Sequence, residues 1–517
     1  MTGLALLGLV MLIVMIGTIF VGFPISFTLL FLALTFGYFG LGEVVFSLAY
    51  FQTIGMMKEE LLAAVPLFIF MGFLTEQAGL MERLFTAFRL LLAPIRGALF
   101  AVVILTAAVF AMATGIVGAA VTVLGIMASP IMVKTGYDGR LSAGAITAGG
   151  TLGILIPPSV MLIVMGPVLG VSVADLYAAA FGPGFLLAAL YLSYLLGRAF
   201  INPKLGPPVP KDERIYGIGR IVSEVLIGVV PLLGLIAATL GSILAGLATP
   251  TEASGIGALG ALLLSAAYGR LTYAGVKRAV LNTTATSSMV LLLAVTSNIF
   301  GAVFARLGTA NWITQTMLAL PFPPVAMLIV VLVLIFLLGW PFEWPAIILV
   351  FLPIFYPVME ALKGNLGVSL GIAPDMVMVW FGAVVAVVLQ TAFLSPPVAM
   401  SAYYLRQVVK EWSLGTIYKG MFEFMILQVI AIAVIVAFPP IVTWFPERLQ
   451  AESRAVITEE VEGGASLEEE GGYGAQLREA LGDGEAGQGA EEAGAGQEEE
   501  ESAGDSLEQD ELSNTKK

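Results

Sequence analysis

Apolar stretches recur along this 517-residue chain at the length that a membrane-crossing helix needs. Such a helix takes about 20 mostly apolar residues, because the hydrocarbon core of a bilayer is about 30 Å thick. Shorter amphipathic pieces at 44–58, 83–95 and 274–286 fit helices lying in the membrane interface. Ten full crossings are predicted, at 3–20, 25–40, 61–77, 141–170, 177–200, 222–246, 250–268, 287–305, 376–405 and 421–445. The pattern predicts an all-α polytopic protein in a lipid bilayer.

The composition agrees with this class and excludes most enzyme chemistry. Hydrophobic residues make up 58% of the chain and charged residues 12%, against about 25% charged in soluble proteins. Cys and His are both absent, which removes disulfides, thiol nucleophiles, zinc sites built on them and imidazole acid–base chemistry. An intramembrane enzyme would need acids or bases converging at one membrane face, and the apolar runs offer none. We therefore predict that the chain is not an enzyme and binds no nucleic acid.

The net negative charge of the chain comes from its C-terminal end. The formal net charge is -13, but residues 451–517 hold 20 of the 37 acidic and 4 of the 24 basic side chains, which leaves +3 for residues 1–450. Segment 447–517 is predicted to be a disordered acidic tail, because it is too charged and too poor in apolar groups to pack. A solubilising role and a partner-binding role both remain open for it.

Two long segments of very low charge are predicted to fold back on themselves. Residues 97–133 contain no charged side chain, and one helix of that length would be far longer than the bilayer is thick. The tip at 114–118 is Thr-Gly-Ile-Val-Gly, without charge or amide, which indicates a re-entrant hairpin buried in protein. Segment 323–359 is equally long and contains a single charged residue, Glu343, within its tip at 338–345, so the same fold-back is predicted for it. An ordinary pair of spans joined by a short loop is the alternative.

The distribution of basic residues tests this count of crossings and hairpins. With the N-terminus outside, only Lys58, Arg306, Lys363 and Arg448 of the 20 basic residues in 1–450 fall on the outer side. The sixteen others fall inside, as the positive-inside rule requires: Arg83, Arg89, Arg96, Lys134, Arg140, Arg198, Lys204, Lys211, Arg214, Arg220, Arg270, Lys277, Arg278, Arg406, Lys410 and Lys419. Both termini are then predicted to be extracytoplasmic. Residues 1–20 have no basic start and no small-residue cleavage site, so we interpret them as a span rather than a cleaved signal.

The two halves of the chain repeat the same landmarks. The matching pairs are Gly72 with Gly301 and Gly79 with Gly308 at an offset of 229, Pro24 with Pro250 at 226, and prolines 157–158 with 396–397 at 239. Each half has five crossings, so the second half is predicted to be inverted relative to the first. We predict a first repeat at 1–202, a cytoplasmic linker at 203–221 and a second repeat at 222–446. Inverted repeats with broken helices are typical of secondary transporters.

Each half contains a helix that is predicted to break within the membrane. Residues 149–159 read Gly-Gly-Thr-Leu-Gly-Ile-Leu-Ile-Pro-Pro-Ser, and the two prolines withhold two backbone donors, so carbonyls are exposed. Sodium is a natural partner for such oxygens. The first sodium site is predicted to comprise Thr114, Gly115, Gly150, Thr151, Gly153 and Pro157. The second, around the break at 390–397, is predicted to comprise Gly339, Trp340, Gln390, Thr391, Ser395 and Pro396. The alternative for each site is a plain proline kink, in which neighbouring helices satisfy the freed backbone groups.

The space between the hairpin tips is the predicted substrate region, with Gly118, Pro158, Ser159 and Pro397. No Arg or Lys lies in the broken spans, so an anionic substrate is expected to be bound by helix N-termini, hydroxyls and bound cations.

Two carboxylates stand out beside these regions. Glu252 belongs to a Thr-Pro-Thr-Glu string at 249–252 that reads as a capping box, so a structural role is favoured there. Glu343 lies at the second tip, before a predicted helix start, and both capping and a gating role remain open for it.

These strings together resemble the large membrane subunit of the tripartite ATP-independent periplasmic (TRAP) transporters over about residues 3–445. The strings that carry the resemblance are 114–120 (TGIVGAA), 134–137 (KTGY), 149–159, 249–253 (TPTEA) and 395–400 (SPPVAM). Many relatives have Ser-Gly-Ser-Ser at the first tip, where this chain has residues 114–117, and an Asp near the second tip, where it has Glu343. At the first tip the resemblance therefore implies sodium ligation by backbone oxygens.

The resemblance implies an elevator-type importer in the bacterial inner membrane, in which the hairpins and broken spans slide as a transport domain against a fixed scaffold. It implies coupling to Na⁺, a small four-span membrane subunit and a periplasmic substrate-binding protein that delivers a carboxylate. The form of the 395–405 string resembles the branch associated with 2-oxo and 2-hydroxy monocarboxylates. A stand-alone carrier of the same architecture, which needs no binding protein, is the alternative.

Overall fold

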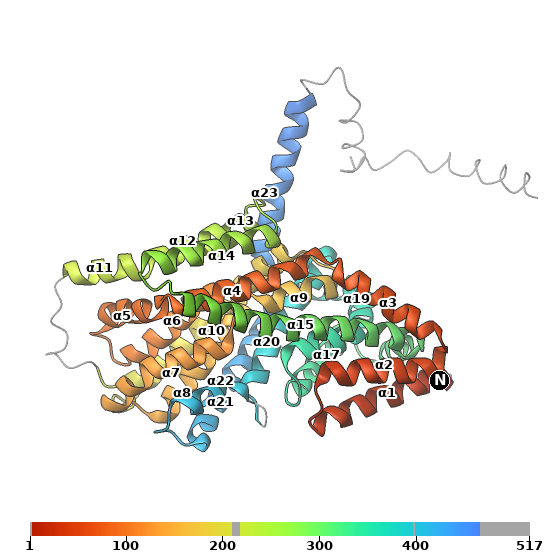
Figure 1. The fold of residues 1–517 in the computed structure, drawn as a ribbon, viewed down its shortest axis with the longest axis horizontal. Helices are drawn as coiled ribbons and strands as arrows, with labels where there is room; N and C mark the ends of the chain where they lie inside the picture. Colours follow the sequence, from red (N-terminus) through yellow and green to blue (C-terminus); the bar gives the residue numbers. More distant parts are fainter. Residues whose placement is uncertain (1–2, 209–217, 397–398, 466–517) are drawn as a thin grey trace, which may run out of the picture. The chain divides into compact units, whose positions relative to one another are not determined.

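The computed structural model describes residues 3–208, 218–396 and 399–465, and all regular secondary structure in these ranges is helical (Figure 1). The centre of the predicted linker, 209–217, the predicted substrate residue Pro397 and the tail from residue 466 lie outside the described residues. The chain up to Leu449 forms one compact unit. Among the described residues, nine helices are long and apolar enough to cross a membrane, or ten when one bent pair is counted as a span.

The first half begins with membrane helices and reaches a hairpin and a broken helix before a last long helix. Its helices are α1 (Gly3–Phe20), α2 (Ile25–Leu41), α3 (Val44–Met57), η1 (Glu60–Ala63), α4 (Ala64–Gln77), α5 (Leu80–Leu92), α6 (Ala98–Thr114), α7 (Val117–Lys134), α8 (Gly139–Leu155), α9 (Val160–Leu169) and α10 (Val173–Ile201). The predicted fold-back of 97–133 is confirmed, with α6 and α7 as its arms.

The second half follows the same order. Its helices are α11 (Ile218–Gly228), α12 (Val230–Ile236), η3 (Ala237–Gly241), α13 (Ser242–Leu244), α14 (Pro250–Ala267), α15 (Tyr273–Arg306), α16 (Thr309–Leu318), α17 (Pro324–Leu338), α18 (Trp344–Ala346), η4 (Ile347–Phe351), α19 (Leu352–Leu370), η5 (Pro374–Met376), α20 (Val377–Leu394), α21 (Met400–Val408), α22 (Leu414–Ala437) and α23 (Pro440–Ala465).

Helices at equivalent places in the two halves also pack on equivalent neighbours. Helix α8 packs on α6 and α7, and its counterpart α20 packs on α17 and α19. Helix α14 packs on α4 as α2 packs on α15, and α22 packs on α8 as α10 packs on α20. The two broken helices α8 and α20 also contact each other. The helix order and the packing therefore agree with the repeat that the sequence indicates.

Local capping explains several helix starts. The Asp138 side chain accepts a hydrogen bond from the Leu141 amide at 2.9 Å and begins α8. The capping box predicted at 249–252 is confirmed, because the Thr249 and Glu252 side chains each accept a hydrogen bond from the other's backbone amide. Glu343 occupies the N-cap of α18, but its side chain makes no capping hydrogen bond, so the capping interpretation of Glu343 is wrong.

Several predicted boundaries are wrong. Residues 274–286 and 287–305 form one continuous helix, α15, because Thr272 caps its start and no Gly or Pro lies between 276 and 300. The second arm of the second hairpin continues past 359 to Leu370, where Gly371 ends it with φ 67°. The span predicted at 421–445 is α22, which ends at Ala437 because prolines 439–440 follow.

The predicted linker and tail are both shorter than the sequence analysis proposes. Helix α11 already begins at Ile218, inside the predicted linker 203–221. Helix α23 continues to Ala465, so disorder from 447 onward is wrong for 447–465. This stretch has no Gly before 463 and is rich in good helix formers such as Glu, Ala, Arg and Leu, which explains the continued helix.

Candidate functional site

The first helix break lies where the sequence places it. Helix α8 ends at Leu155 and α9 begins at Val160, with a bend of 46° between them. Prolines 157–158 have no N–H to offer to the carbonyls of Gly153 and Ile154. The Ser159 hydroxyl replaces one of these donors by bonding to the Ile154 carbonyl oxygen. The Gly153 carbonyl is left without a donor from its own helix.

The first hairpin tip lies against this break. Gly115 adopts φ 60°, and a Cβ placed there would lie 3.4 Å from the Pro158 carbonyl oxygen and 3.8 Å from that of Gly153. Glycine thus allows both the left-handed turn and the close approach of the two backbones. Thr114 is less well placed: its hydroxyl donates to the Phe110 carbonyl at 3.2 Å, and its own carbonyl oxygen lies against Gly72 of α4.

The second break repeats this arrangement with different side chains. Helix α20 ends at Leu394 and α21 begins at Met400. Proline 396 has no N–H for the carbonyl of Ala392, and a Cβ at the hairpin residue Gly339 would lie 3.2 Å from the Ala392 Cβ. Trp340 is 43% exposed and its ring lies against Phe336. Trp340 can therefore contribute only its backbone groups to a sodium site at this tip.

Two polar residues of the predicted sodium sites, Thr151 and Gln390, meet where α8 contacts α20. The Thr151 hydroxyl lies 3.3 Å from Gln390 Oε1 and donates to the Ala148 carbonyl at 2.8 Å. The Thr391 hydroxyl donates to the Val388 carbonyl at 2.6 Å. Ser395 is buried, and its hydroxyl has no hydrogen-bond partner among the residues that the structure describes. The structure thus brings Thr151 of the first set into contact with Gln390 of the second.

A cavity of about 160 Å³ lies between the two hairpin tips. Four of its lining residues are the first residues of helices: Val117 of α7, Val160 of α9, Trp344 of α18 and Met400 of α21. Helix N-termini present unbonded N–H groups and a partial positive charge of about +0.5 each. The cavity lining contains no Arg or Lys among the described residues, so these termini are its main source of positive potential.

The predicted substrate residues surround this cavity in part. Gly118 lines it, and a Cβ at Gly118 would lie 3.0 Å from the Tyr404 ring. Pro158 and Ser159 are buried beside the lining residue Val160 but do not line the cavity themselves. Glu343 contributes one carboxylate to the lining. The site can therefore hold a small anion against helix N-termini, with a cation near a carboxylate as a second possible occupant.

Sequence reasoning missed several residues of the cavity. Tyr404 lies in the string that carries the family resemblance but was assigned no role, and its contact with Gly118 gives it one. Thr286 and Met289 also line the cavity. The predicted division at 286/287 places Thr286 in an interfacial helix, whereas the continuous helix α15 places it in the lining of the cavity between the tips.

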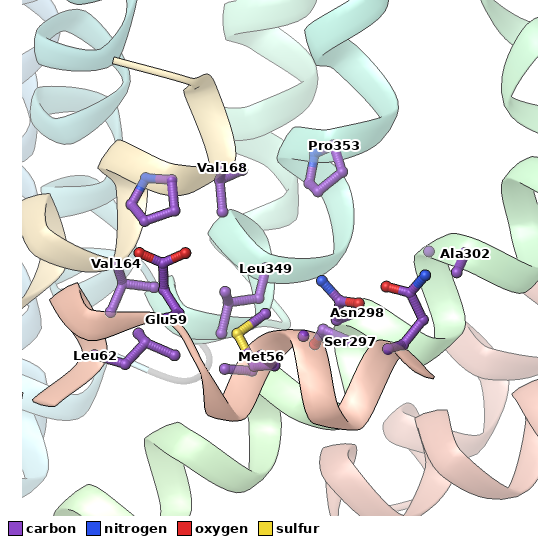
Figure 2. A pocket seen from close by; sticks show the side chains of 15 residues that line it. Met56, Glu59, Leu62, Val164, Val168, Ser297, Asn298, Ala302, Leu349 and Pro353 are labelled. Atoms are coloured by element: carbon purple, nitrogen blue, oxygen red, sulfur yellow. The ribbon is translucent and has the colours of Figure 1, made fainter. Parts of the chain in front are cut away.

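A second and larger cavity of about 560 Å³ lies between α3, α9, α15 and the helix that contains η4 and α19. Figure 2 shows Glu59 at one end and Asn298 at the other, with Met56 and Leu349 between them. The Asn298 Oδ1 and Ser297 Oγ atoms are buried without a partner among the described residues. In the predicted topology this outer cavity is on the extracytoplasmic side, because its lining includes residues close to Lys58 and Arg306.

The fold is that of multi-span helical membrane transporters. The YdaH transporter of Alcanivorax borkumensis superposes with a TM-score of 0.53 at 17% identity, over 77% of this chain and 88% of that one. MtrF of Neisseria gonorrhoeae, whose structure is described as illuminating a class of antimetabolite efflux pumps, gives a TM-score of 0.52 at 14% identity, over 77% of this chain and 84% of that one. At these identities the likeness concerns the fold alone.

The family is set by the sequence itself. Residues 10–441 match the family of the tripartite ATP-independent periplasmic transporter, DctM component, and the chain belongs to this family. It is a transport permease and not an enzyme. A tripartite system implies a small permease and a periplasmic binding protein as further components.

Named relatives differ in what they carry. The large permease protein SiaM of a sialic acid TRAP transporter from Vibrio cholerae is 29% identical over 436 residues, which is 84% of this chain and 96% of SiaM. The C4-dicarboxylate TRAP large permease DctM of Rhodobacter capsulatus is 27% identical over 411 residues, covering 77% and 89%. The isethionate TRAP permease DctMQ of Oleidesulfovibrio alaskensis is 27% identical over 348 residues, and this chain matches 51% of its length.

Proposed function

We propose that this chain is the large permease of a sodium-coupled importer for an organic anion that binds in the cavity between the hairpin tips. The observation that carries the proposal is the convergence of four helix N-termini on a cavity whose described lining contains no basic side chain. N–H groups at helix starts bind carboxylate or sulfonate oxygens without a lysine or arginine. The related permeases named for sialic acid, C4-dicarboxylates and isethionate all concern organic anions.

The substrate class we propose is a carboxylate, with 2-oxo and 2-hydroxy monocarboxylates as the first candidates. The cavity of about 160 Å³ suits a small acid, and Thr286 and Tyr404 add polar groups to its lining. Delivery is assigned to a periplasmic binding protein, and a small four-span subunit completes the membrane part. These assignments rest on the family, whose systems are tripartite.

Sodium is proposed to bind at the two helix breaks. At the first break the Gly153 carbonyl, freed by Pro157, lies beside Gly115 of the tip, with Gly150 and Thr151 in the preceding turn. At the second break the equivalent residues are Ala392, freed by Pro396, and Gly339, with Gln390, Thr391 and Ser395 close in sequence. Neutral oxygens of this kind suit a monovalent cation. TRAP transporters are often cation-coupled.

The transport cycle is proposed to be of the elevator type, in the bacterial inner membrane. The moving body comprises the hairpins at 97–133 and 323–359 and the broken helices, and the two halves are inverted repeats with both termini outside. Single cysteines at Lys58 and Lys134 test this orientation against a membrane-impermeant thiol reagent, because the chain has no cysteine of its own. Labelling of K58C from the outer side and of K134C only from the inner side is expected. The reverse pattern would refute the topology.

Reconstituted uptake tests the function. The permease, its small subunit and its binding protein are placed in and around proteoliposomes, and the substrate is first identified as the ligand that raises the Tm of the binding protein. Uptake is expected to require an inward sodium gradient and all three components. Equal uptake with choline in place of sodium would refute sodium coupling.

A cavity-filling variant tests the position of the substrate. Gly118→Leu is expected to reduce uptake strongly, because its side chain enters the cavity against Tyr404. Gly197→Leu on α10 is the matched control, since a Cβ at Gly197 meets nothing within 4 Å. Equal uptake by both variants would place the substrate elsewhere.

A further inference from the structure

Four fully buried polar side chains meet between α8, α10, α20 and α22. They are Thr151, Tyr191, Gln390 and Gln428, one from each helix, and each is 0% exposed. The Tyr191 hydroxyl faces the side chains of both Gln428 and Thr151, and Thr151 Oγ1 lies 3.3 Å from Gln390 Oε1. These four residues are called the polar cluster below. Tyr191 and Gln428 belong to neither predicted sodium site.

The polar cluster cannot satisfy its own hydrogen-bonding groups. Both side-chain polar atoms of Gln428, the Gln390 Nε2 and the Tyr191 hydroxyl have no partner of good geometry among the described residues. A threonine hydroxyl has one proton, and that of Thr151 already bonds to the Ala148 carbonyl at 2.8 Å. Rotating the Gln390 amide would give Thr151 a donor but would leave Oε1 unpaired. Some group of the cluster needs an outside partner in either orientation.

We propose that the polar cluster is a binding site for at least one internal water molecule. Its unpaired groups include donors, on the two amides and the phenol, and acceptors, on the amide oxygen and the threonine. Water donates and accepts at once and commonly fills such buried sites. A cation would use only the acceptor oxygens of the cluster and leave the amide NH₂ groups unpaired, and an empty site would leave every one of these groups desolvated and unpaired.

The helices around the polar cluster are held firmly in place. Helix α22 crosses α8 so closely that a Cβ at Gly420 would lie 2.2 Å from the Arg140 carbonyl oxygen, and one at Gly144 would lie 2.6 Å from the Phe424 ring. One turn away, Arg140 and Glu423 form an ion pair at 2.9 Å. This close packing fixes the position of α22 along α8, and therefore the position of Gln428 beside Tyr191. A water molecule at the polar cluster would thus meet hydrogen-bonding partners that are already in place.

The polar cluster lies between the helices that precede the two breaks, so a water molecule bound there would affect the proposed sodium sites. Thr151 and Gln390 are 239 residues apart, the same offset that relates the two double prolines, so they are equivalent residues that touch where the two halves meet. A water bonded to this pair links the helices that precede both breaks. Tyr191 and Gln428 then act as positioning residues for Thr151 and Gln390. This last step rests on the proposed sodium sites, whereas the water itself does not.

A double-mutant cycle tests the water. Gln390 and Gln428 make no hydrogen bond to each other among the described residues, so coupling between them must run through the proposed water or through Tyr191 and Thr151. Gln390→Leu and Gln428→Leu are each expected to lower the Tm of the purified protein, and the double variant to lower it by less than the sum. Gln315→Leu, on an exposed position of α16, is the control and is expected to combine additively with either. Additive loss in the Gln390–Gln428 pair would overturn the proposal.

Experimental maps of the complex in sodium and in choline identify the occupant. A peak within hydrogen-bonding distance of Tyr191 and Gln428 in both conditions is the expected result. A peak lost in choline, or no peak in either map, would overturn the assignment to water.

Sodium-dependent uptake tests the positioning role separately. Tyr191→Phe is expected to raise the half-saturating sodium concentration severalfold, and Tyr50→Phe, on the exposed face of α3, to leave it unchanged. Unchanged sodium dependence in Tyr191→Phe would overturn the positioning role. If uptake proves independent of sodium, the proposed function fails, while the Tm cycle and the maps still decide the water site.

Discussion

Gly72 of α4 and Gly301 of α15 occupy equivalent positions in the two halves, yet their surroundings differ. A Cβ at Gly72 would lie 2.6 Å from the Thr114 carbonyl oxygen, so the first hairpin tip is pressed against α4. A Cβ at Gly301 meets nothing within 4 Å, and Gly301 lines the outer cavity of about 560 Å³. One half therefore holds its tip against the neighbouring helix, and the other leaves an open space at the same point.

The comparison teaches that the repeat preserves backbone features and not their environment. Both halves keep a helix break at a double proline and a glycine at the hairpin tip. The first tip, at 114–118, has no aromatic or charged side chain and has a left-handed Gly115, whereas the second, at 338–345, has three aromatic residues, Glu343 and a helical Gly339 with φ -64°. The two tips thus pack differently against their neighbouring helices. This difference agrees with the proposed inverted repeats, because in an alternating-access transporter the two repeats adopt different conformations in each state.

The largest expected effect comes from restoring the missing donor at the first break. Pro157→Ala supplies an N–H that bonds to the Gly153 carbonyl and removes it from the proposed sodium site. Losing one interaction with a charged partner is worth about 1.5–3 kcal/mol, so the half-saturating sodium concentration is expected to rise on the order of 10- to 100-fold. Pro396→Ala should act alike at the second break.

Pro130→Ala, on an exposed position of α7, is the matched control for these two variants. If neither Pro157→Ala nor Pro396→Ala changed the sodium dependence, the proposal that both breaks bind sodium would be contradicted.

The next largest effect is expected where the first hairpin tip packs against α4. Gly72→Ala forces a Cβ against the Thr114 backbone, and overpacking of this kind costs about 1–3 kcal/mol of stability. Gly301→Ala places its methyl in open space and is expected to leave stability unchanged or raise it slightly, because alanine favours the helix. Thermal unfolding of the two variants measures the difference. A loss of similar size in both would abolish the asymmetry described above.

The two tip glycines should also respond differently. Gly115 adopts φ 60°, where a non-glycine residue costs about 1–2 kcal/mol, so Gly115→Ala is expected to reduce uptake about tenfold. Gly339 has φ -64°, and Gly339→Ala only needs its neighbours Ala392 and Phe336 to give slightly. Uptake by G339A is expected to fall less than uptake by G115A. A larger loss of uptake in G339A than in G115A would indicate that the strained turn lies in the second tip.

The smallest effect separates two threonines. Thr151→Val and Thr391→Val are both expected to raise the half-saturating sodium concentration, and Thr151→Val more, because the Thr151 hydroxyl lies 3.3 Å from Gln390 Oε1 in the other half of the chain, whereas the Thr391 hydroxyl donates to Val388 of its own helix. A hydroxyl contributes about 0.5–1.5 kcal/mol, which corresponds to a change of a fewfold up to about tenfold. Sodium titration of uptake decides the order, and no change in either variant would exclude both as ligands.

Much of this architecture could be predicted from the sequence because its causes are local. A proline cannot donate a backbone hydrogen bond wherever it lies, so the breaks at 157–158 and 396–397 follow from the residues themselves. The fold-back at 114–118 follows from the length of an uncharged segment. The capping box at 249–252 depends on four adjacent residues.

What the sequence did not reveal depends on residues distant in the chain. The contact between Thr151 and Gln390 spans 239 positions and is set by how α8 crosses α20. The role of Tyr404 arises from its packing on Gly118. The continuity of α15 through Thr286 was missed because the polar residues at 282–288 resemble an interfacial end, although no helix breaker lies among them.

The central claim is that each half frees a backbone carbonyl beside a hairpin tip and thereby holds a sodium ion. The most direct measurement is the Tm of the purified permease as sodium replaces choline at constant ionic strength, in the wild type and in the double variant Pro157→Ala/Pro396→Ala. A ligand that binds only the folded state raises the Tm with its concentration. We expect a sodium-dependent rise in the wild type that is lost in the double variant; an equal rise in both, or none in the wild type, would contradict the account.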